Sequence, residues 1–341
     1  MGKAARQASR ERLRQERLKE KQRAKRNRIL GVVGAALVVV LLVVGGGYLY
    51  LTSQRESEQQ FAEQYAALPP QEVQQDGSVV LAEEGAEAPV VEVYADFQCP
   101  ACQEFEKASG PTLQKLAADG RAIVHYRPVS IFAQQPAPIS SNSLRSAAAA
   151  RAAADYGKFV QYHDILFENQ PTEGTVGFAA DDLKQWGEDA GIDAPAFADR
   201  IDAESAAVDQ FTGEYSQQLM SAAQDEFSQQ KLQGMSLGEL MEWGDENGVD
   251  RSFLEDTYVK EILDATAAVN ERYSGGESEF SGTPSVYVNG AKLGNEAFSG
   301  SGIENAVENA EPGQVDTEPL ASDDAASGAS PENEESPDAK E

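Results

Sequence analysis

Hydrophobic residues form three kinds of pattern along this chain. The first is an apolar run without a charged side chain, from Ile29 to Leu51. The second is a set of short runs rich in β-branched residues and bounded by Gly, Pro or Asn, which predict strands. These strands are expected at Val79–Leu81, Val90–Tyr94, Ala122–Arg127, Ser285–Val288 and Ala291–Leu293. The third pattern has the three-to-four-residue spacing of amphipathic helices.

Helical spacing predominates in the long stretch between the third and fourth predicted strands. A helix is also expected at Gln103–Asp119, where Gly120 ends it, and another at Gly302–Ala310. The helices of the central stretch are expected at Ala147–Ala154, Phe159–Asn169, Ala180–Gly191, Ala206–Lys231, Leu237–Gly248 and Phe253–Tyr273. The pattern therefore predicts strands at both ends of a folded region and helices between them.

One motif occurs twice in the helical stretch. Leu183–Phe197 and Leu240–Phe253 share the pattern L-x-x-W-G-[DE]-[DE]-x-G-[IV]-D. Each copy predicts a helix that ends at Gly, followed by an Asp suited to cap the next helix. A duplicated helix pair would explain the repeat, and convergence of two similar corners is the alternative. We expect both Trp residues to anchor the core.

The apolar run at 29–51 is long enough to span a bilayer, since a helix of this length covers roughly 34 Å. Residues 1–28, a predicted cytoplasmic segment, hold 12 of the 28 basic residues and only 3 of the 57 acidic ones. Basic residues on one side of a transmembrane helix favour the cytoplasm, so the rest of the chain is expected outside it. The alternative is a cleaved signal peptide, but no A-x-A site follows the run.

The remaining composition divides the exported part into three regions. Residues 52–78 are rich in Gln and Glu and predict a stalk or linker, and residues 311–341 are acidic and predict a disordered tail. The folded domain is expected at 79–310. The whole chain has a net charge of −29, and residues 29–341 hold 16 of the basic and 54 of the acidic residues, so nucleic acid is not an expected partner.

The only two cysteines, Cys99 and Cys102, follow a predicted strand and begin a predicted helix. At a helix N-terminus, free N–H groups and the helix dipole favour a thiolate. Pro100 suits the first helical position, and Cys102 lies one turn further on. We therefore predict that Cys99 forms the mixed disulfide with a substrate and that Cys102 resolves it.

Three other interpretations of this cysteine pair were weighed. A zinc site needs about four ligands, and the two histidines, His125 and His163, lie in unrelated segments. A structural disulfide would close only a very short loop and stabilise little. An unreactive buried pair is the third alternative. We favour redox chemistry and expect neither a metal nor another cofactor.

A second motif, Gly282-Thr283-Pro284, precedes the strand Ser285–Val288 and an Asn-Gly turn. With this motif, the chain resembles the DsbA-like branch of the thioredoxin superfamily, in its membrane-anchored Gram-positive form. The matching stretches are APVVEVYADFQCPACQEFE, YHDILFENQ and GTPSVYVNGAKLGN. The resemblance implies an α/β, thioredoxin-like fold with a large, partly duplicated helical insertion at about 140–272, preceded by one transmembrane helix.

The resemblance also implies a function and assigns roles to particular residues. Thr283 and a cis Pro284 would face the cysteine pair and bind an extended substrate. The enzyme would oxidise cysteine pairs in exported proteins at the cell membrane, and a quinone-linked membrane partner would reoxidise it. Strong oxidants of this family often carry His where this chain has Ala101, so we expect a milder oxidant.

A buried acid often accepts a proton in such folds, and two acids are candidates here. Asp96 lies three residues before Cys99, where it also suits the entry to a helix, and Glu92 lies on the preceding strand. We expect His125 and His163 to be structural. Two alternatives remain for the whole protein: a reductase or isomerase that uses the same pair, or a thioredoxin-like module that only binds peptides.

Overall fold

The computed structural model of the protein describes residue 19 and residues 65–315. Among these residues, no helix has the length and apolar character needed to cross a membrane. The predicted transmembrane helix at 29–51 lies outside the described residues, as do most of the basic segment 1–28 and residues 316–341 of the predicted tail.

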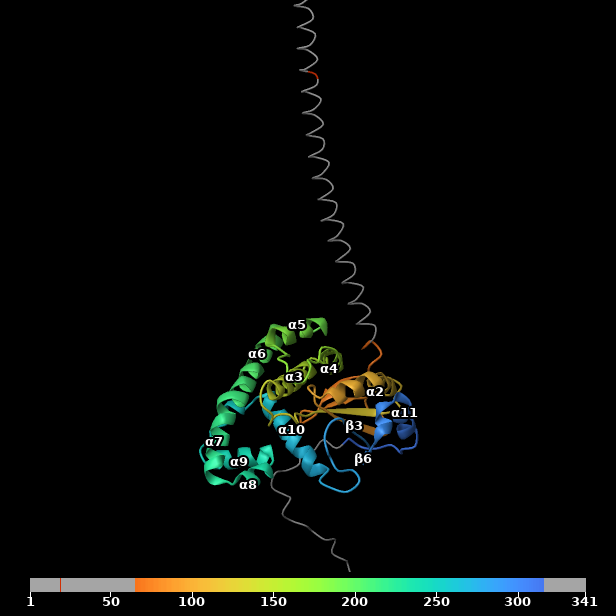
Figure 1. Cartoon of the computed structure of the whole chain (residues 1–341). Coiled ribbons are helices and arrows are strands. Elements are labelled where there is room, and N and C mark those ends of the chain that lie inside the picture. The colour runs from red at the N-terminus through yellow and green to blue at the C-terminus, as the bar shows by residue number, and fades with distance from the viewer. Residues whose placement is uncertain (1–18, 20–64, 316–341) are drawn as a thin grey trace, which may run out of the picture. The chain divides into compact units, whose positions relative to one another are not determined.

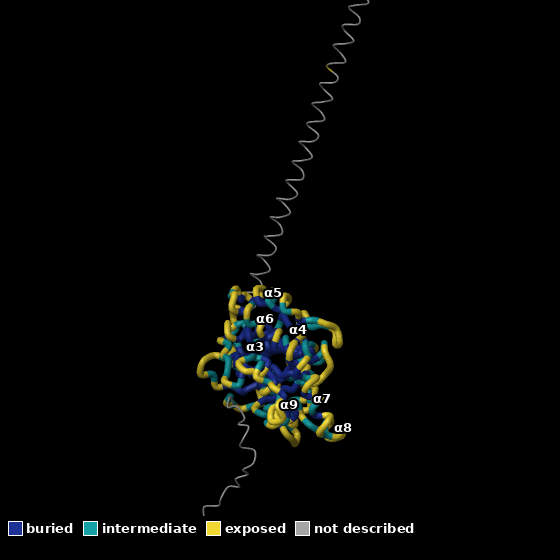
Figure 2. Tube along the Cα trace, turned by 90° about the vertical axis from the view of Figure 1, so that its left-hand side faces the viewer, coloured by how far each residue is buried: buried dark blue, intermediate teal, exposed yellow. Residues whose placement is uncertain are grey.

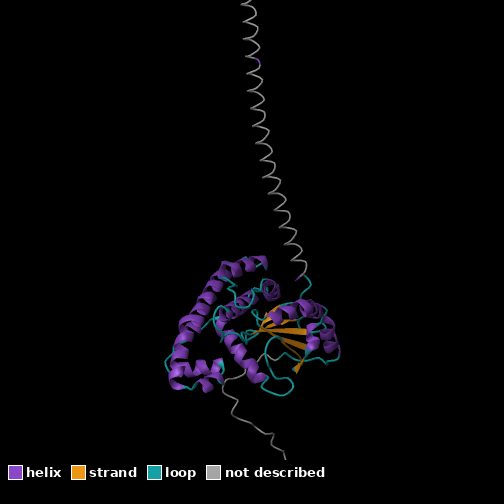
Figure 3. Ribbon diagram, viewed as in Figure 1, coloured by secondary structure: helices purple, strands orange, loops and turns teal. Residues whose placement is uncertain are grey.

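Six strands form one mixed sheet in the order β1-β2-β4-β3-β5-β6 (Figure 3). Their bounds are Gln71–Val73 (β1), Val79–Leu81 (β2), Val90–Ala95 (β3), Ile123–Pro128 (β4), Ser285–Val288 (β5) and Ala291–Lys292 (β6). Strands β3 and β4 are parallel, with Val91 opposite Val124. Strands β3 and β5 are antiparallel, with Val93 opposite Val286. This pairing places the segment before β5 beside the end of β3.

The sheet extends beyond the predicted domain. Strand β1 lies within 52–78, where we predicted a stalk, and it pairs with β2 through Glu72 and Val80. At the other end, the N–H of Gly313 donates to the carbonyl of Ala88 at 3.0 Å. The predicted linker therefore ends too late, at residue 78, and the predicted tail begins too early, at residue 311. Backbone pairing overrides the polar composition of both segments.

Helix α2 (Pro100–Ala118) crosses from β3 to the parallel strand β4 and packs against α11 (Gly300–Glu308). A short 3₁₀ helix at Asn295–Phe298 completes this part of the fold. Helix α2 begins at Pro100, the first helical position expected from the sequence, because Pro100 supplies the φ angle of a first helical turn and Cys99 takes the extended N-cap conformation.

The region between β4 and β5 is helical, as predicted, and surrounds the buried helix α3 (Figures 1 and 2). Its helices are α3 (Ile139–Ala154), α4 (Phe159–Glu168), α5 (Ala180–Asp189), α6 (Pro195–Gln210), α7 (Ser216–Glu226), α8 (Gln229–Gln233), α9 (Leu237–Glu246) and α10 (Tyr258–Arg272). A π-helical turn at Phe211–Tyr215 joins α6 to α7, and a 3₁₀ turn at Ser252–Leu254 precedes α10.

Several helix boundaries differ from the prediction. Helix α3 begins eight residues before Ala147, and its polar side chains are buried with its alanines. The single helix predicted at 206–231 is wrong: this range holds the end of α6, the π-helical turn and α7, and the extended backbone of Phe227 separates α7 from α8. Helix α10 begins at Tyr258 instead of Phe253, because Asp256 takes a φ of +60°, which a helix does not allow.

The two copies of the Trp-Gly motif lie at equivalent places, at the C-terminal halves of α5 and α9. A Cβ on Gly187 would meet the ring of Phe197 at 2.2 Å, and one on Gly244 would meet Leu219 at 2.4 Å. Each Gly therefore allows a close contact with the neighbouring helix. The predicted Asp cap is wrong for the first copy, since the N-cap residue of α6 is Ala194. In the second copy, the Asp250 carboxylate accepts a hydrogen bond at 2.8 Å from the N–H of Ser252, the first residue of the following 3₁₀ turn.

The two Trp rings of the motif are partly buried, and each packs against a Phe. Trp186 meets the edge of Phe178 with ring centroids 6.1 Å apart. Trp243 meets Phe227 with centroids 5.0 Å apart. The rings thus hold neighbouring segments of the insertion together, as predicted for core anchors, although both remain partly exposed.

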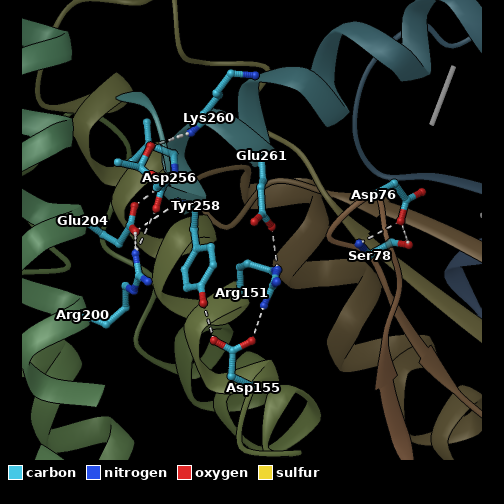
Figure 4. Close-up of polar contacts among 12 residues, drawn as sticks. Asp76, Ser78, Arg151, Asp155, Arg200, Glu204, Asp256, Tyr258, Lys260 and Glu261 are labelled. Carbon is cyan, nitrogen blue, oxygen red and sulfur yellow. Dashed lines mark hydrogen bonds and ion pairs between the residues drawn. The ribbon is translucent and has the colours of Figure 1, made fainter. Parts of the chain in front are cut away.

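Charged side chains tie α3, α6 and α10 together (Figure 4). Glu204 of α6 is buried and accepts hydrogen bonds from the N–H groups of Tyr258 and Val259, each at 3.0 Å, in the first turn of α10. The ring of Tyr258 lies between two guanidinium groups, those of Arg151 at 4.4 Å and Arg200 at 4.5 Å. These contacts fix the start of α10, which then packs along β4 and α3.

Candidate active site

The cysteine pair lies where β3 ends and α2 begins. Cys99 is the N-cap residue of α2, with an extended backbone, and Pro100 occupies the first helical position. The side chain of Cys99 is 7% exposed and that of Cys102 is fully buried. Both are free thiols in this structure. Only Cys99 is therefore open to attack from outside, which matches the predicted order of roles.

The Thr283–Pro284 segment lies against this pair, although it is 184 residues from Cys99 in the sequence. The Cys99 thiol donates to the carbonyl of Thr283 at a sulfur–oxygen distance of 3.4 Å. The peptide bond between Thr283 and Pro284 is cis, as the resemblance implied. The sequence analysis placed both residues beside the cysteines, and the antiparallel pairing of β3 with β5 brings them there.

The two thiols differ sharply in acidity. A hydrogen bond from the Cys102 thiol, together with bonds from Thr283 and from the N–H groups of Cys102 and Ala101, outweighs burial and lowers the pKa of Cys99 to about 6. Burial raises the pKa of Cys102 well above its usual range, and the negative charge on Cys99 raises it further. At neutral pH, Cys99 is thus a thiolate and Cys102 a thiol.

Asp96 is completely buried, and its carboxyl group interacts electrostatically with the Cys99 sulfur. Its carboxylate accepts hydrogen bonds from the N–H of Gln98 at 2.9 Å and from the hydroxyl of Ser143 at 2.7 Å. Burial dominates and raises the pKa of Asp96 to about 7, and the charge of Cys99 adds to the increase. The backbone N–H of Asp96 favours the Cys102 thiolate. Asp96 can therefore gain or lose a proton near neutral pH.

Glu92, the other candidate acid, has different neighbours. It is paired with Arg127 at 3.3 Å and with Arg272 at 3.1 Å. The hydroxyl of Tyr94 also donates to it at 2.9 Å. Its side chain lies on the sheet face that α10 covers and belongs to the framework. Of the two acids, only Asp96 is placed to act on the cysteines.

Four polar residues that the sequence analysis did not select hold the active-site loop. The Gln170 amide donates to the carbonyls of Phe97, at 2.7 Å, and Cys99, at 3.0 Å. The buried Gln98 accepts from the Asn142 amide at 2.6 Å, and Ser143 donates to Asp96. Two features of the sequence could have pointed to these residues. Gln170 ends the YHDILFENQ stretch, and Asn142 and Ser143 are polar residues at the start of an alanine-rich helix.

The hydrogen bonds of the two histidines go to Ser78 and Asp164, away from the cysteines. His125 on β4 is fully buried and lies 2.5 Å from the hydroxyl of Ser78. Burial, with the charge of Arg127, lowers its pKa to about 3. His125 is therefore neutral at physiological pH, and the prediction that it is structural agrees with this place in the sheet.

His163 has charged partners that the sequence analysis missed. Burial opposes its charge, but Glu106 at 3.5 Å and Asp164 at 3.1 Å raise its pKa to about 9. Its ring packs edgewise on Phe97, with centroids 5.4 Å apart. His163 thus joins α4 to α2 and to the loop before Cys99. Sequence reasoning could not find Glu106, because only the packing of α4 on α2 brings it to His163.

The described residues contain no cluster of three or more His, Cys, Asp or Glu side chains that could hold a metal ion. What the site offers is a reactive sulfur, a partner sulfur one turn away and a buried acid beside them. A disulfide between Cys99 and Cys102 could be opened by an incoming thiolate and closed again. The arrangement is therefore suited to thiol–disulfide exchange.

Comparison with known proteins gives a consistent picture. The model of the family described as thioredoxin matches residues 76–309. None of the curated proteins matches the sequence with significance. Among solved structures, the MdbA thiol–disulfide oxidoreductase from Corynebacterium diphtheriae is 18% identical, with a TM-score of 0.46, and the match covers 70% of this chain and 93% of that one.

Two further solved structures match to a similar degree. The disulfide bond oxidoreductase DsbG from Mycobacterium tuberculosis is 24% identical with a TM-score of 0.41, covering 68% of this chain and 84% of that one. BdbD from Bacillus subtilis is 16% identical with a TM-score of 0.43, covering 71% of this chain and 95% of that one.

Proposed function

We propose that this chain, which belongs to the thioredoxin family, is a thiol–disulfide oxidoreductase of the DsbA type that oxidises cysteine pairs in exported proteins. The observation that carries the proposal is the contrast between the two thiols. Cys99 is accessible and acidic, whereas Cys102 is buried and weakly acidic. In thiol–disulfide exchange, the sulfur that holds the substrate must also be a good leaving group, and a thiol of low pKa meets this need.

The reaction starts from the disulfide between Cys99 and Cys102. A substrate thiolate attacks the sulfur of Cys99, the Cys99–Cys102 bond breaks, and Cys102 leaves as a thiolate. Because the pKa of Cys102 is raised, this thiolate takes a proton, and the proposed donor is Asp96, a buried acid whose carboxyl interacts with the neighbouring Cys99 sulfur. A second substrate thiolate then attacks the substrate sulfur of the mixed disulfide and releases Cys99 as a thiolate. The substrate gains a disulfide and the enzyme holds two reduced sulfurs.

Three further residues have assigned roles in this proposal. The backbone at Thr283 and Pro284 would pair with an extended substrate beside Cys99. Ala101, the residue before Cys102, offers only its backbone N–H to the Cys99 thiolate. A histidine there would add a cationic partner and lower the pKa of Cys99 further. We therefore expect this enzyme to be a milder oxidant than its Ala101→His variant.

The cellular setting is part of the same proposal. The apolar run at 29–51, preceded by twelve basic residues, supports a single membrane anchor with a cytoplasmic N-terminus. The site would then lie outside the cytoplasm, close to newly exported proteins with free cysteines. A quinone-linked membrane protein would accept the electrons from Cys99 and Cys102.

The decisive test is the redox potential of the Cys99–Cys102 couple, measured at equilibrium with glutathione, together with the refolding of a reduced, disulfide-containing substrate. We expect a potential between those of DsbA, about −120 mV, and thioredoxin, about −270 mV. The Cys99→Ala variant should lose all oxidative refolding. A potential below that of thioredoxin would favour a reductase. If the wild type and Cys99→Ala both lack exchange activity but bind a reduced peptide equally well, the chain is only a peptide-binding module.

A further inference from the structure

The loop at residues 171–177, between α4 and α5, is fastened to the segment that carries the reactive cysteine. Its first carbonyl, that of Pro171, accepts a hydrogen bond from the side-chain amide of Gln98 at 3.3 Å. The residue just before the loop, Gln170, donates to the carbonyl of Cys99 at 3.0 Å. A polypeptide joined to the Cys99 sulfur therefore passes close to the start of this loop.

The far end of the same loop is held by Asn142 of α3, whose side chain is buried. Its amide nitrogen donates to the side-chain oxygen of Gln98 at 2.6 Å and to the carbonyl of Thr175 at 2.8 Å. Its amide oxygen accepts from the N–H of Gly177 at 3.1 Å. Because one nitrogen bonds both oxygens, the Thr175 carbonyl lies next to the side chain of the residue that precedes Cys99.

Packing closes the 171–177 loop on itself. A Cβ on Gly177 would meet the ring of Pro171 at 2.6 Å, so the two ends of the loop touch. The next residue, Phe178, is buried against Trp186 and takes a φ of +52°, a left-handed conformation that bulky side chains rarely adopt. The loop is thus shaped before a partner binds, which lowers the entropic cost of binding.

Val176 projects from this fixed loop into solvent, with an exposed fraction of 82%. Three other large hydrophobic side chains are exposed in the described part of the chain, by 38–40%: Tyr156, Met220 and Phe298. A single exposed apolar residue is ordinary on a protein surface. What distinguishes Val176 is its place, since Asn142 holds the backbone on both sides of it and also bonds the residue before Cys99.

We propose that the 171–177 loop is a substrate-selecting surface, on which Val176 binds an apolar side chain of the polypeptide that reacts at Cys99. The inference rests on the proposed function, because the occupant is the substrate of the exchange reaction. An extended chain covers about 3.3 Å per residue. A residue two or three positions from the substrate cysteine therefore reaches the loop.

This surface gives the enzyme a preference that backbone pairing alone does not supply. Pairing along Thr283 and Pro284 accepts any extended sequence, whereas side-chain contacts distinguish one sequence from another. Folded proteins bury most of their large apolar side chains, and chains that have not yet folded present them beside their cysteines. Val176 therefore selects unfolded substrates. It touches no reacting atom, so it is a specificity residue and not a catalytic one.

The experiment compares two reduced peptides as substrates of the full chain in its disulfide form. Each peptide has two cysteines that can close to a disulfide. One carries Leu two residues before the first cysteine and two residues after the second, and the other carries Ser at both places. The second-order rate constant for oxidation of each peptide is measured by acid quenching and mass spectrometry. The readout is the ratio of the two rate constants, the Leu peptide over the Ser peptide.

The ratio is measured in the wild type and in three surface variants. Val176→Ser removes the apolar side chain, and Val176→Ile retains one. Met220→Ser is the matched control, because Met220 is an exposed apolar residue on α7, which lies far from α2 in Figure 1. All three substitutions are at exposed positions, so the fold is kept.

We expect a ratio of about five in the wild type, the effect of removing about 40 Å² of apolar surface from water. The ratio should stay near five in Val176→Ile and Met220→Ser and fall to about one in Val176→Ser. A disturbance that spreads through Asn142 to the cysteines would slow both peptides alike and leave the ratio unchanged.

Three results would overturn the inference: a wild-type ratio of one, an unchanged ratio in Val176→Ser, or an equal loss in Met220→Ser. In each of these cases the Ser peptide is still oxidised, and the proposed function stands. If the wild type oxidises neither peptide, the proposed function itself is refuted.

Discussion

Two buried acids near the end of β3 have opposite surroundings. Glu92 lies among charged groups and is paired with Arg127 and Arg272. Asp96 lies four residues further on, and its carboxylate is held by two backbone N–H groups and the Ser143 hydroxyl. The partners of Glu92 are thus charged side chains from other elements, whereas those of Asp96 are neutral donors in a buried site, where burial raises its pKa to about 7.

The difference explains how one strand can serve both the framework and the chemistry. The Glu92 cluster ties α10 to the sheet, since Arg272 and Tyr273 belong to the end of that helix and its C-cap. The hydrogen bonds to the Asp96 carboxylate come from neutral donors, and the carboxyl group interacts with the Cys99 sulfur. A buried acid is thus a candidate for catalysis when its partners are neutral and a reactive group lies nearby.

The largest effect that separates the two regions is one of stability. Glu92→Gln removes the shared partner of two arginines, and breaking a buried ion pair costs about 3–5 kcal/mol. We expect a loss of that order in the free energy of unfolding, measured by urea denaturation. The exchange activity per folded molecule should stay unchanged. A stable Glu92→Gln protein without activity would contradict the division of roles.

The pH dependence of stability should identify Asp96. Burial raises its pKa from 3.8 to about 7, so the native carboxyl keeps its proton where the unfolded chain has released it. Stability from this group is present below about pH 4 and is lost as the pH rises through 7, by up to about 1.4 kcal/mol per pH unit. Urea unfolding from pH 4 to 6 should show this slope in the wild type and lack it in Asp96→Asn.

The activity of Asp96→Asn is the counterpart of the Glu92 test. The amide keeps the shape of the side chain but cannot give a proton to Cys102. We expect the rate of exchange with a reduced peptide to fall about 100-fold, the lower end of the range for general acid–base catalysis. Stopped-flow kinetics at pH 7 would measure it. A rate equal to that of the wild type would mean that Asp96 only shapes the entry to α2.

The smallest effect concerns the acidity of Cys99. The rate of its alkylation by iodoacetamide should rise with pH around a midpoint near 6, where the Cys102 thiol and backbone N–H groups hold its pKa. Asp96→Asn should move this midpoint down by less than about one unit, because a neighbouring negative charge is removed. The Glu92→Gln midpoint should equal that of the wild type. A larger shift in Glu92→Gln than in Asp96→Asn would reverse the comparison.

The sequence alone determined the local features of the active site. A strand, two cysteines one turn apart, a proline at the first helical position and a second proline before a distant strand are all read from neighbouring residues. The positions of five of the six strands along the chain and the helical insertion were also predicted, since hydrophobic spacing indicates the kind of element, whereas the order of the strands in the sheet was not. Element boundaries were less accurate where backbone pairing decided them, as at β1, or where a single φ angle did, as at Asp256.

Only the tertiary structure decided which polar groups meet. Asp96 and Glu92 are both buried acids beside the same cysteines in sequence, and nothing in their spacing separates them. The distinction comes from Ser143 on α3 and from Arg127 and Arg272, which reach β3 from other elements. Proton affinity in a folded protein depends on burial and on partners brought together across the chain, and a pattern along the chain does not contain that information.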